Sequence, residues 1–248
     1  MIASMFMGAG CSADIRTPVA FLTTPNPSTT PQVIALTLPV MRSTSTTVLA
    51  SATPTETPIH RPSNTATSTQ VVERPFEIGY SVQGRPLLAY RIGNGSIVRL
   101  LVGGIHGGYE WNTTTLLDQF ILYLTESPDI IPPQITLYII PLANPDGAAM
   151  GTDRVFGRLN ANSVDLNRNW DYQWQSTATH GTNVVSAGSV PFSEPETVAL
   201  RDFILDHKVQ AAIFYHSAMS EVYSGAGDDT SKTEELALLM AQYTGYRY

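Results

Sequence analysis

Charged side chains are scarce in this sequence of 248 residues, at 14% of the total, and no stretch is rich in lysine or arginine. The formal net charge is −7. Nucleic acids are bound by clustered basic side chains, so the lack of any basic run argues against them as partners. After the N-terminal residues, the chain also has no apolar run approaching the roughly 20 residues that a transmembrane helix needs. Its 43% hydrophobic content is nevertheless enough for a sizeable core.

Cysteine occurs only once, as Cys11, which excludes an internal disulfide bond. In "MFMGAGCSAD" the small residues 8–10 directly precede this cysteine and follow a short apolar start. The segment resembles a bacterial lipoprotein signal, in which the cysteine is lipidated and becomes the mature N-terminus. We therefore expect residues 1–11 to act as a signal and the protein to be exported, as a cell-surface lipoprotein or an extracellular protein. The only link to a membrane would be a lipid on Cys11. The alternative is an incidental cysteine in a cytosolic N-terminus.

Residues 12–73 are dense in serine, threonine and proline, as in "RSTSTTVLASATPTETP". Such a composition buries too little apolar surface to offset the entropy lost when a chain becomes ordered. We expect an extended, mobile tether that ends near Val72. One folded domain should then occupy residues 74–248.

From residue 74 onward the pattern is that of alternating strands and helices. A hairpin joined at Gly84 is expected first, because two strand-like runs flank this glycine. Ser193 and Glu196 have the spacing of a capping box, which predicts that Ser193 caps a helix. Buried strands are expected at 97–105, 134–142 and 209–215, and helices at 110–127, 192–207 and 231–245. This alternation predicts an α/β fold with a mixed, largely parallel sheet flanked by helices.

Polar groups follow the carboxyl ends of all three expected buried strands. His106 follows the first strand, "NPDG" at residues 144–147 follows the second, and His216 follows the third. In sheets of this kind ligands gather at the carboxyl ends of the strands. Taken singly, each histidine is more simply explained as a satisfied core residue. Three polar sites at three strand ends are not what core packing predicts.

The other three histidines have a structural explanation. His60 lies in the expected tether and His180 in a polar loop. His207 falls at the end of an expected helix, where a positive charge suits the helix dipole.

Longer motifs give these positions a family resemblance. Glu110 follows His106 in "LVGGIHGGYEWN", and downstream come "NPDG", "RLNANSVDLNRNW", "FSEPET" and "FYHS". In order and spacing, from about Phe76 to Tyr248, the motifs are similar to those of the carboxypeptidase A-type zinc metallopeptidases. The resemblance implies that His106, Glu110 and His216 bind one Zn²⁺. Zinc in hydrolytic sites takes three protein ligands of this His₂Glu kind and leaves a fourth position open.

The resemblance also implies roles for the arginine-rich segment. Asn167 and Arg168 match the pair that binds the terminal carboxylate of a peptide, which a planar guanidinium suits well. Arg158 matches the arginine that polarises the scissile carbonyl, with Arg154 as a competing candidate. Asp165 is a candidate for orienting a ligand histidine. The alternative for Asn167 and Arg168 is a capped turn with a surface ion pair.

Two departures from the family pattern stand out. The family spacing is H-x-x-E, whereas this chain has H-x-x-x-E, and Gly107 and Gly108 have the backbone freedom to absorb the extra residue. In the family a glutamate well downstream of the third ligand acts as general base, and a tyrosine on a mobile loop closes over the substrate. The sequence stops at Tyr248, 32 residues after His216. We expect both segments, and the C-terminal part of the fold, to be missing.

Three functions follow from these observations. The first is zinc-dependent removal of a C-terminal residue from a peptide or a cell-wall peptide, impaired here because the general-base segment is expected to be absent. The second is a non-catalytic zinc-containing domain that binds peptide carboxylates on a lipoprotein tether. The third is a structural lipoprotein domain without a metal.

Overall fold

The computed structural model describes residues 72–217, 219–225 and 231–248. Cys11 and residues 12–71 lie outside these residues, so the lipoprotein signal and the tether stay predictions. At the start of the described chain, Val72 already pairs with Ile92 through an isolated antiparallel bridge. In this part of the chain no helix has the length and apolarity to cross a bilayer.

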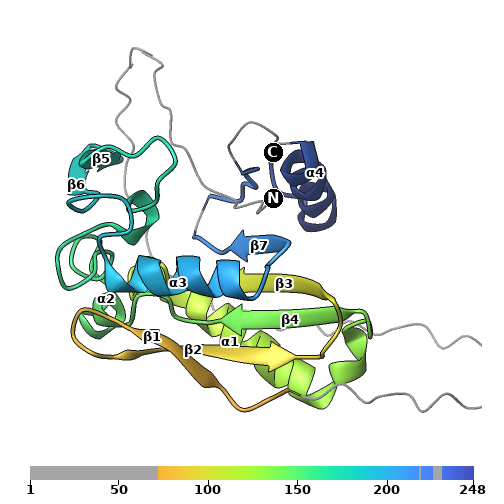
Figure 1. Ribbon diagram of the computed structural model, residues 1–248. Helices are drawn as coiled ribbons and strands as arrows, with labels where there is room; N and C mark the ends of the chain where they lie inside the picture. The colour runs from red at the N-terminus through yellow and green to blue at the C-terminus, as the bar shows by residue number, and fades with distance from the viewer. Residues whose placement is uncertain (1–71, 218, 226–230) are drawn as a thin grey trace, which may run out of the picture. The chain divides into compact units, whose positions relative to one another are not determined.

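The domain is built on a five-stranded sheet with the strand order β1-β2-β4-β3-β7 (Figure 1). Strands β4 and β7 run parallel to β3, β2 is antiparallel to β4, and β1 is antiparallel to β2. The strands are β1 (Phe76–Tyr80), β2 (Pro86–Ile92), β3 (Ile97–Val102), β4 (Ile135–Ile140) and β7 (Ala211–Phe214). The mixed, largely parallel sheet predicted from the sequence is therefore confirmed.

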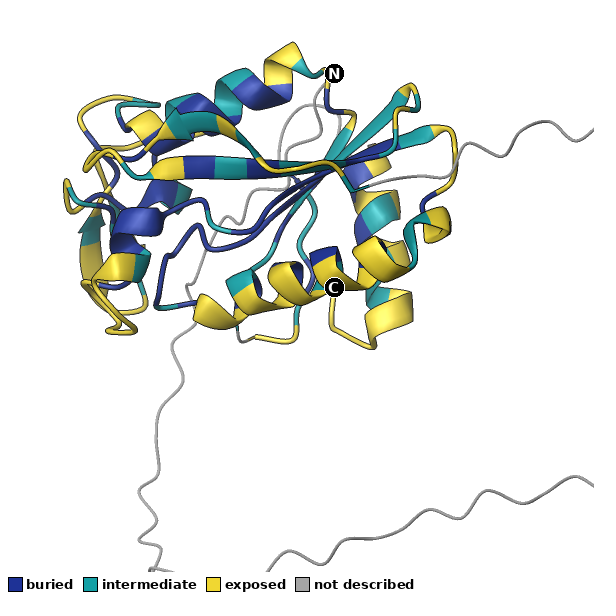
Figure 2. Ribbon diagram, turned by 90° about the horizontal axis from the view of Figure 1, so that it is seen from below, coloured by how far each residue is buried: buried dark blue, intermediate teal, exposed yellow. Residues whose placement is uncertain are grey.

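A long helix packs on each face of the sheet (Figure 2). Side chains along a strand alternate between the two faces, so the two helices contact different residues of the same strands. On the first face, Leu101 and Ile139 of the strands pack with Leu117, Ile121 and Leu124 of helix α1 (Trp111–Glu126). Together with Thr113, these are the buried residues of the helix, and they have the helical spacing expected from the sequence.

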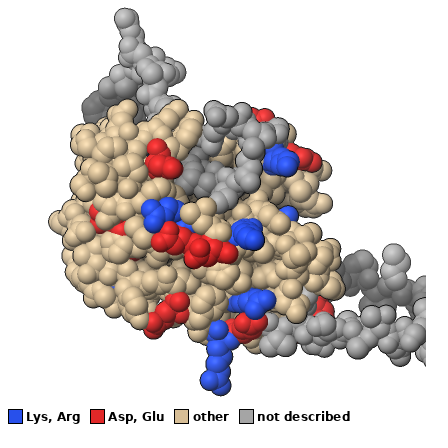
Figure 3. Space-filling view, in the orientation of Figure 1, with Lys and Arg blue, Asp and Glu red and all other residues tan. Residues whose placement is uncertain are grey.

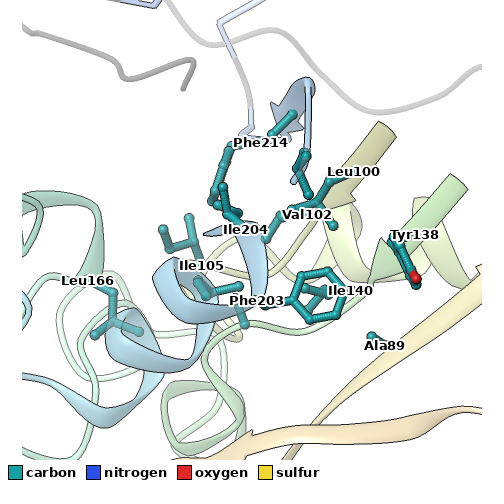
Figure 4. Packing of buried hydrophobic residues seen from close by; sticks show 14 of the residues in the cluster. Ala89, Leu100, Val102, Ile105, Tyr138, Ile140, Leu166, Phe203, Ile204 and Phe214 are labelled. Atoms are coloured by element: carbon teal, nitrogen blue, oxygen red, sulfur yellow. The ribbon is translucent and has the colours of Figure 1, made fainter. Parts of the chain in front are cut away.

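On the second face, the neighbouring strand residues pack against helix α3 (Pro195–Asp206). Figure 4 shows Phe203 and Ile204 of this helix beside Val102 and Ile140 of the strands. The two helices thus hold β3 and β4 from opposite sides. This fixes the carboxyl ends of the parallel strands, where the candidate site lies.

The capping box expected at α3 is wrong. The N-cap residue is Glu194, and no side chain caps from that position. Ser193 instead donates to the Glu194 carboxylate over 2.7 Å, and Glu196 accepts from the Val82 amide over 3.1 Å. The side chain of Asn169 takes over the capping role, because its oxygen accepts from the Glu194 amide over 3.1 Å. The helix is therefore capped by Asn169, a residue distant from it in sequence.

The place of His207 at a helix end is confirmed, because it is the C-cap of α3. It follows α3, but its ring packs against Phe203 and Tyr138, with centroid distances of 4.2 and 4.7 Å. Burial lowers the pKa of His207 below its ordinary value. The lowered pKa makes the positive charge expected at this helix end less favourable.

Short elements fill the connections around the site. They are η1 (Pro128–Ile130), α2 (Pro145–Ala149), η2 (Leu166–Arg168) and a small hairpin of β5 (Thr177–His180) and β6 (Asn183–Ser186). The hairpin was not predicted, and it places His180 at the end of a strand rather than in a loop. Helix α4 (Ser231–Thr244) follows near the end of the chain, as expected.

Few charges lie on the face of the molecule drawn in Figure 3, and acidic and basic side chains are mixed there. This agrees with the low charged fraction of the sequence.

Candidate metal centre

His106 lies on a tight loop after the carboxyl end of β3. The next residue, Gly107, has a φ of 47°, and a Cβ atom there would lie 2.6 Å from the Ala148 amide nitrogen. A Cβ on Gly108 would lie 2.2 Å from the Gly151 carbonyl oxygen. The two glycines therefore let the loop pack directly on backbone. The H-x-x-x-E spacing folds compactly for this reason.

Glu110 occupies the N-cap position of α1 but forms no side-chain cap. Its carboxylate is buried, at 4% exposure for the residue, and points to other groups of the site. Thr113 fixes the backbone at this point, because its hydroxyl donates to the Glu110 carbonyl over 2.8 Å and accepts from the Gly104 amide over 2.9 Å. The Glu110 carboxylate therefore does not cap the helix, and Thr113 fixes the backbone that carries it.

His216 reaches the same place from the neighbouring parallel strand. It follows β7, which pairs with β3. Its Nδ1 lies 3.0 Å from Oε2 of Glu110, and its ring centroid lies 5.0 Å from that of His106. One potential ligand atom from each of His106, Glu110 and His216 lies within 4.8 Å of the other two. The structure therefore brings the three predicted ligands together as a group that could hold a metal ion.

The chemistry of this group suits zinc. Nδ1 of His106 is fully buried and has no hydrogen-bond partner among the described residues. Its closest acidic neighbour is Oδ1 of Asp165, at 3.6 Å. Burial, aided by the charge of Arg158, holds the pKa of His106 well below its ordinary value, so the ring is neutral and can donate a lone pair. A satisfied core histidine would not leave this atom unpaired, and two imidazoles with one carboxylate are a zinc donor set.

Arg158 and Asp165 form the buried charged layer beside these residues. Nε and Nη2 of Arg158 contact Oδ2 of Asp165 at 3.0 and 2.9 Å, and Nη1 lies 4.0 Å from Oε1 of Glu110. Asp165 also accepts from the Asn167 amide over 3.0 Å, at the start of η2. Asp165 thus links the position of Arg158 to that of the Asn167 segment. Arg154, the competing candidate, is exposed.

Asn167 and Arg168 lie half-buried on η2. The guanidinium of Arg168 donates only to backbone carbonyls, those of Asn167 at 3.2 Å and Thr179 at 3.5 Å. Within the described part of the chain it has no carboxylate partner. Of the alternative considered for Asn167 and Arg168, the capped turn is present, because Asp165 caps η2 through the Asn167 amide, whereas the described residues contain no ion pair of Arg168. Burial is the main cause of the lowered pKa of His106, and the charge of Arg168 is among the smaller causes.

Two aromatic residues at the site were missed from the sequence. The ring of Tyr109 lies 5.9 Å from the guanidinium carbon of Arg158 and 5.8 Å from the ring of His180. Tyr109 lies between His106 and Glu110, in the segment that is one residue longer than the family spacing. This extra residue could have drawn attention to Tyr109. His180 gave none, because its hairpin was not predicted.

A buried polar network supports the loop that carries Arg158. Asn160 donates to Glu194 over 2.7 Å and to Glu196 over 3.2 Å, and its oxygen accepts from the Val164 amide over 3.0 Å. Burial raises the pKa of Glu196 above its ordinary value. The "FSEPET" motif is thus used to hold the loop of residues 160–164, and its acids do not reach the three candidate ligands.

Comparison with known sequences agrees with this geometry. The profile of the zinc carboxypeptidase family matches residues 63–246. Murein peptide amidase A of Escherichia coli is 30% identical over 178 residues, which cover 65% of this chain and 68% of the amidase. Carboxypeptidase B of Astacus astacus is 28% identical over 162 residues, which cover 57% of this chain and 53% of that enzyme. The chain thus spans about half the length of the second relative.

Solved structures share the fold. Carboxypeptidase A from Helicoverpa armigera matches with a TM-score of 0.56 and 27% identity, over 69% of this chain and 48% of that one. The murein-tripeptide amidase MpaA from Escherichia coli O157 matches with a TM-score of 0.53 and 23% identity, over 71% of this chain and 72% of that one. At that identity the second likeness concerns the fold alone.

Proposed function

Because the chain belongs to the zinc carboxypeptidase family, we propose that it binds one Zn²⁺ through His106, Glu110 and His216 and acts on peptides at a free C-terminus. The observation that carries this proposal is the group of His106, Glu110 and His216, which could hold a metal ion. The role in C-terminal recognition is supported by Arg168, an arginine that lacks an acidic partner among the described residues. The substrate class is peptides with a terminal carboxylate. Cell-wall peptides are included, because one relative is named a murein peptide amidase.

The residues around the proposed zinc ion have distinct roles in this proposal. Zinc bound at such a site acts as a Lewis acid and makes a water molecule reactive at neutral pH. Arg168 and Asn167 bind the terminal carboxylate and so fix which peptide bond is presented. Arg158 is held by Asp165 and directs Nη1 toward the ligand group, where it stabilises negative charge that develops on the scissile carbonyl.

Replacement of Arg168 by alanine tests the carboxylate role. We expect the affinity for a blocked dipeptide with a free C-terminus to fall about tenfold or more, because a charge-assisted hydrogen bond is lost. The affinity for the amidated dipeptide should change little. Isothermal titration with zinc-loaded protein measures both. Arg74→Gln is the matched control, since Arg74 is exposed and precedes β1. Equal losses for acid and amide in Arg168→Ala would refute the assignment.

We also propose that the polypeptide of 248 residues turns its substrate over slowly. Hydrolysis needs a positioned proton acceptor, a contribution of about 10²–10⁴ in rate. Asp165 is occupied by Arg158, and Glu221, the first acid after His216 in the sequence, bonds to Arg247 and Tyr223. With both carboxylates engaged in these contacts, turnover should be slow. Binding of peptide carboxylates without turnover is the second candidate function.

The turnover number of the zinc-loaded polypeptide on a blocked dipeptide separates the two functions. Carboxypeptidase B of Astacus astacus, assayed on the same peptide, is the reference. We expect a turnover number lower by about two orders of magnitude or more, since Asp165 and Glu221 are both engaged in other contacts. Comparable turnover numbers would show that a base exists within the 248 residues.

A further inference from the structure

Three arginines converge on the tip of the β5–β6 hairpin, around residues 179–181. Arg168 donates to the Thr179 carbonyl over 3.5 Å. Arg154 lies over the other end of this tripeptide, because its Nη2 would be 3.1 Å from a Cβ atom on Gly181. Between the two is His180, whose ring packs on Tyr109, and Tyr109 in turn packs on Arg158. Two guanidinium groups thus lie at the turn itself, and Arg158 is connected to it through Tyr109 and His180.

This convergence is electrostatically unfavourable without an anion. Guanidinium groups stay charged at all ordinary pH values, so neighbouring ones repel each other. Of the three, only Arg158 has a carboxylate partner in the described residues, and that partner is Asp165. Asp153, next to Arg154 in the sequence, uses its carboxylate on the amides of Val155 and Phe156.

The surroundings of His180 show the same excess of positive charge. Burial is the main cause of its lowered pKa, and the charges of Arg158, Arg154 and Arg168 lower the pKa further, against a smaller opposite effect of Asp165. The chain as a whole has 14 basic against 21 acidic residues. A local gathering of unpaired cations in an acidic protein indicates a site for anionic ligands.

The two unpaired arginines lie at neighbouring residues of one turn. Arg168 contacts Thr179, and Arg154 lies at Gly181, two residues further along the chain. A ligand with two carboxylates close together, as in a C-terminal glutamate, offers one acceptor group to each arginine. Arg168 is half-buried and Arg154 exposed, which places the second group nearer to the solvent.

We propose that Arg154 and the β5–β6 turn form a second anion-binding position beside Arg168, so that the preferred peptide ends in a residue with a side-chain carboxylate. This inference rests on the proposed function, in which Arg168 binds the terminal α-carboxylate. Arg154 is here a specificity-determining residue and takes no part in the chemistry.

Three small ligands test the two carboxylate positions separately. N-acetylglutamine against its α-amide reports on Arg168, because only the α-carboxylate differs. N-acetylglutamate against N-acetylglutamine reports on Arg154, because only the side-chain charge differs. Binding to the zinc-loaded full chain is measured by isothermal titration at low and at high salt.

For the unmodified protein we expect N-acetylglutamate to bind roughly fivefold more tightly than N-acetylglutamine at low salt, and less so at high salt, as for an exposed ion pair. In Arg154→Gln this ratio should fall to about one, while the preference for N-acetylglutamine over its amide stays. Arg154→Lys should keep part of the ratio, since the charge remains. Arg74→Gln should keep all of it. Zinc content and the unfolding temperature check that each variant is folded.

A ratio near one in the unmodified protein, or an unchanged ratio in Arg154→Gln, overturns the inference. If the free acid of N-acetylglutamine is preferred over the amide in either of these cases, the proposed function survives without it. If that preference is also absent, the carboxylate role of Arg168 fails independently of Arg154.

Discussion

At the scale of single residues, two groups of the candidate site lack the hydrogen bonds that their positions would ordinarily provide. Glu110 stands at the start of α1, where an acid usually caps the helix, yet its carboxylate contacts His216 and faces Arg158. His106 is among the largest fully buried side chains and still has an unpaired Nδ1. Buried polar atoms are rarely left without partners, so such departures mark functional positions.

Among the predicted site residues, His106 and His216 were accessible from the sequence because each follows a strand whose end the sequence revealed. Glu110 was predicted from the family resemblance of the motif around His106 and stands at the start of α1. Tyr109 and His180 were not, because their importance lies in contacts between segments distant in sequence. No local pattern announces such contacts. The role assigned here to Arg154 likewise depends on a turn that only the three-dimensional structure provides.

At the scale of elements, sequence patterns predicted the strands and helices of the core because burial leaves continuous apolar runs in the strands and a helical spacing of apolar residues in the helices. The strand β4 (Ile135–Ile140) lies within the expected 134–142, and α1 (Trp111–Glu126) within 110–127. The start of α3 was predicted wrongly for a physical reason. Its cap comes from Asn169, and the acid that looked like half of a capping box serves the Val82 amide instead.

This reassigned cap leads to a prediction about stability. The Asn169 side chain donates to the carbonyls of Ala187 and Val190 and accepts from the Glu194 amide and the Thr197 hydroxyl. Replacing it with alanine leaves several buried groups unpaired, so we expect the free energy of unfolding to fall by about 2–4 kcal/mol. Ser193→Ala, the change that a capping box would make harmful, should cost about 1 kcal/mol or less. Urea unfolding followed by circular dichroism measures both. A larger loss in Ser193→Ala than in Asn169→Ala would restore the capping box.

At the scale of the whole molecule, the ligand group exists only when the sheet is assembled. His106 and Glu110 come from the loop after β3, whereas His216 comes from β7, more than a hundred residues later in the chain. Pairing of the two parallel strands brings them together. Because the unfolded chain cannot hold the ion in this way, zinc binding should favour the folded domain.

Zinc content after exhaustive dialysis of zinc-loaded protein tests this account most directly. We predict about one zinc ion per chain for the unmodified protein and for His180→Ala, whose imidazole lies near the site but outside the ligand group. His216→Ala should retain almost none, because the site keeps only two ligands and zinc centres of this kind need three from the protein. Circular dichroism of each variant establishes that it is folded. Undiminished zinc in a folded His216→Ala variant would contradict the assignment of His106, Glu110 and His216 as the metal centre.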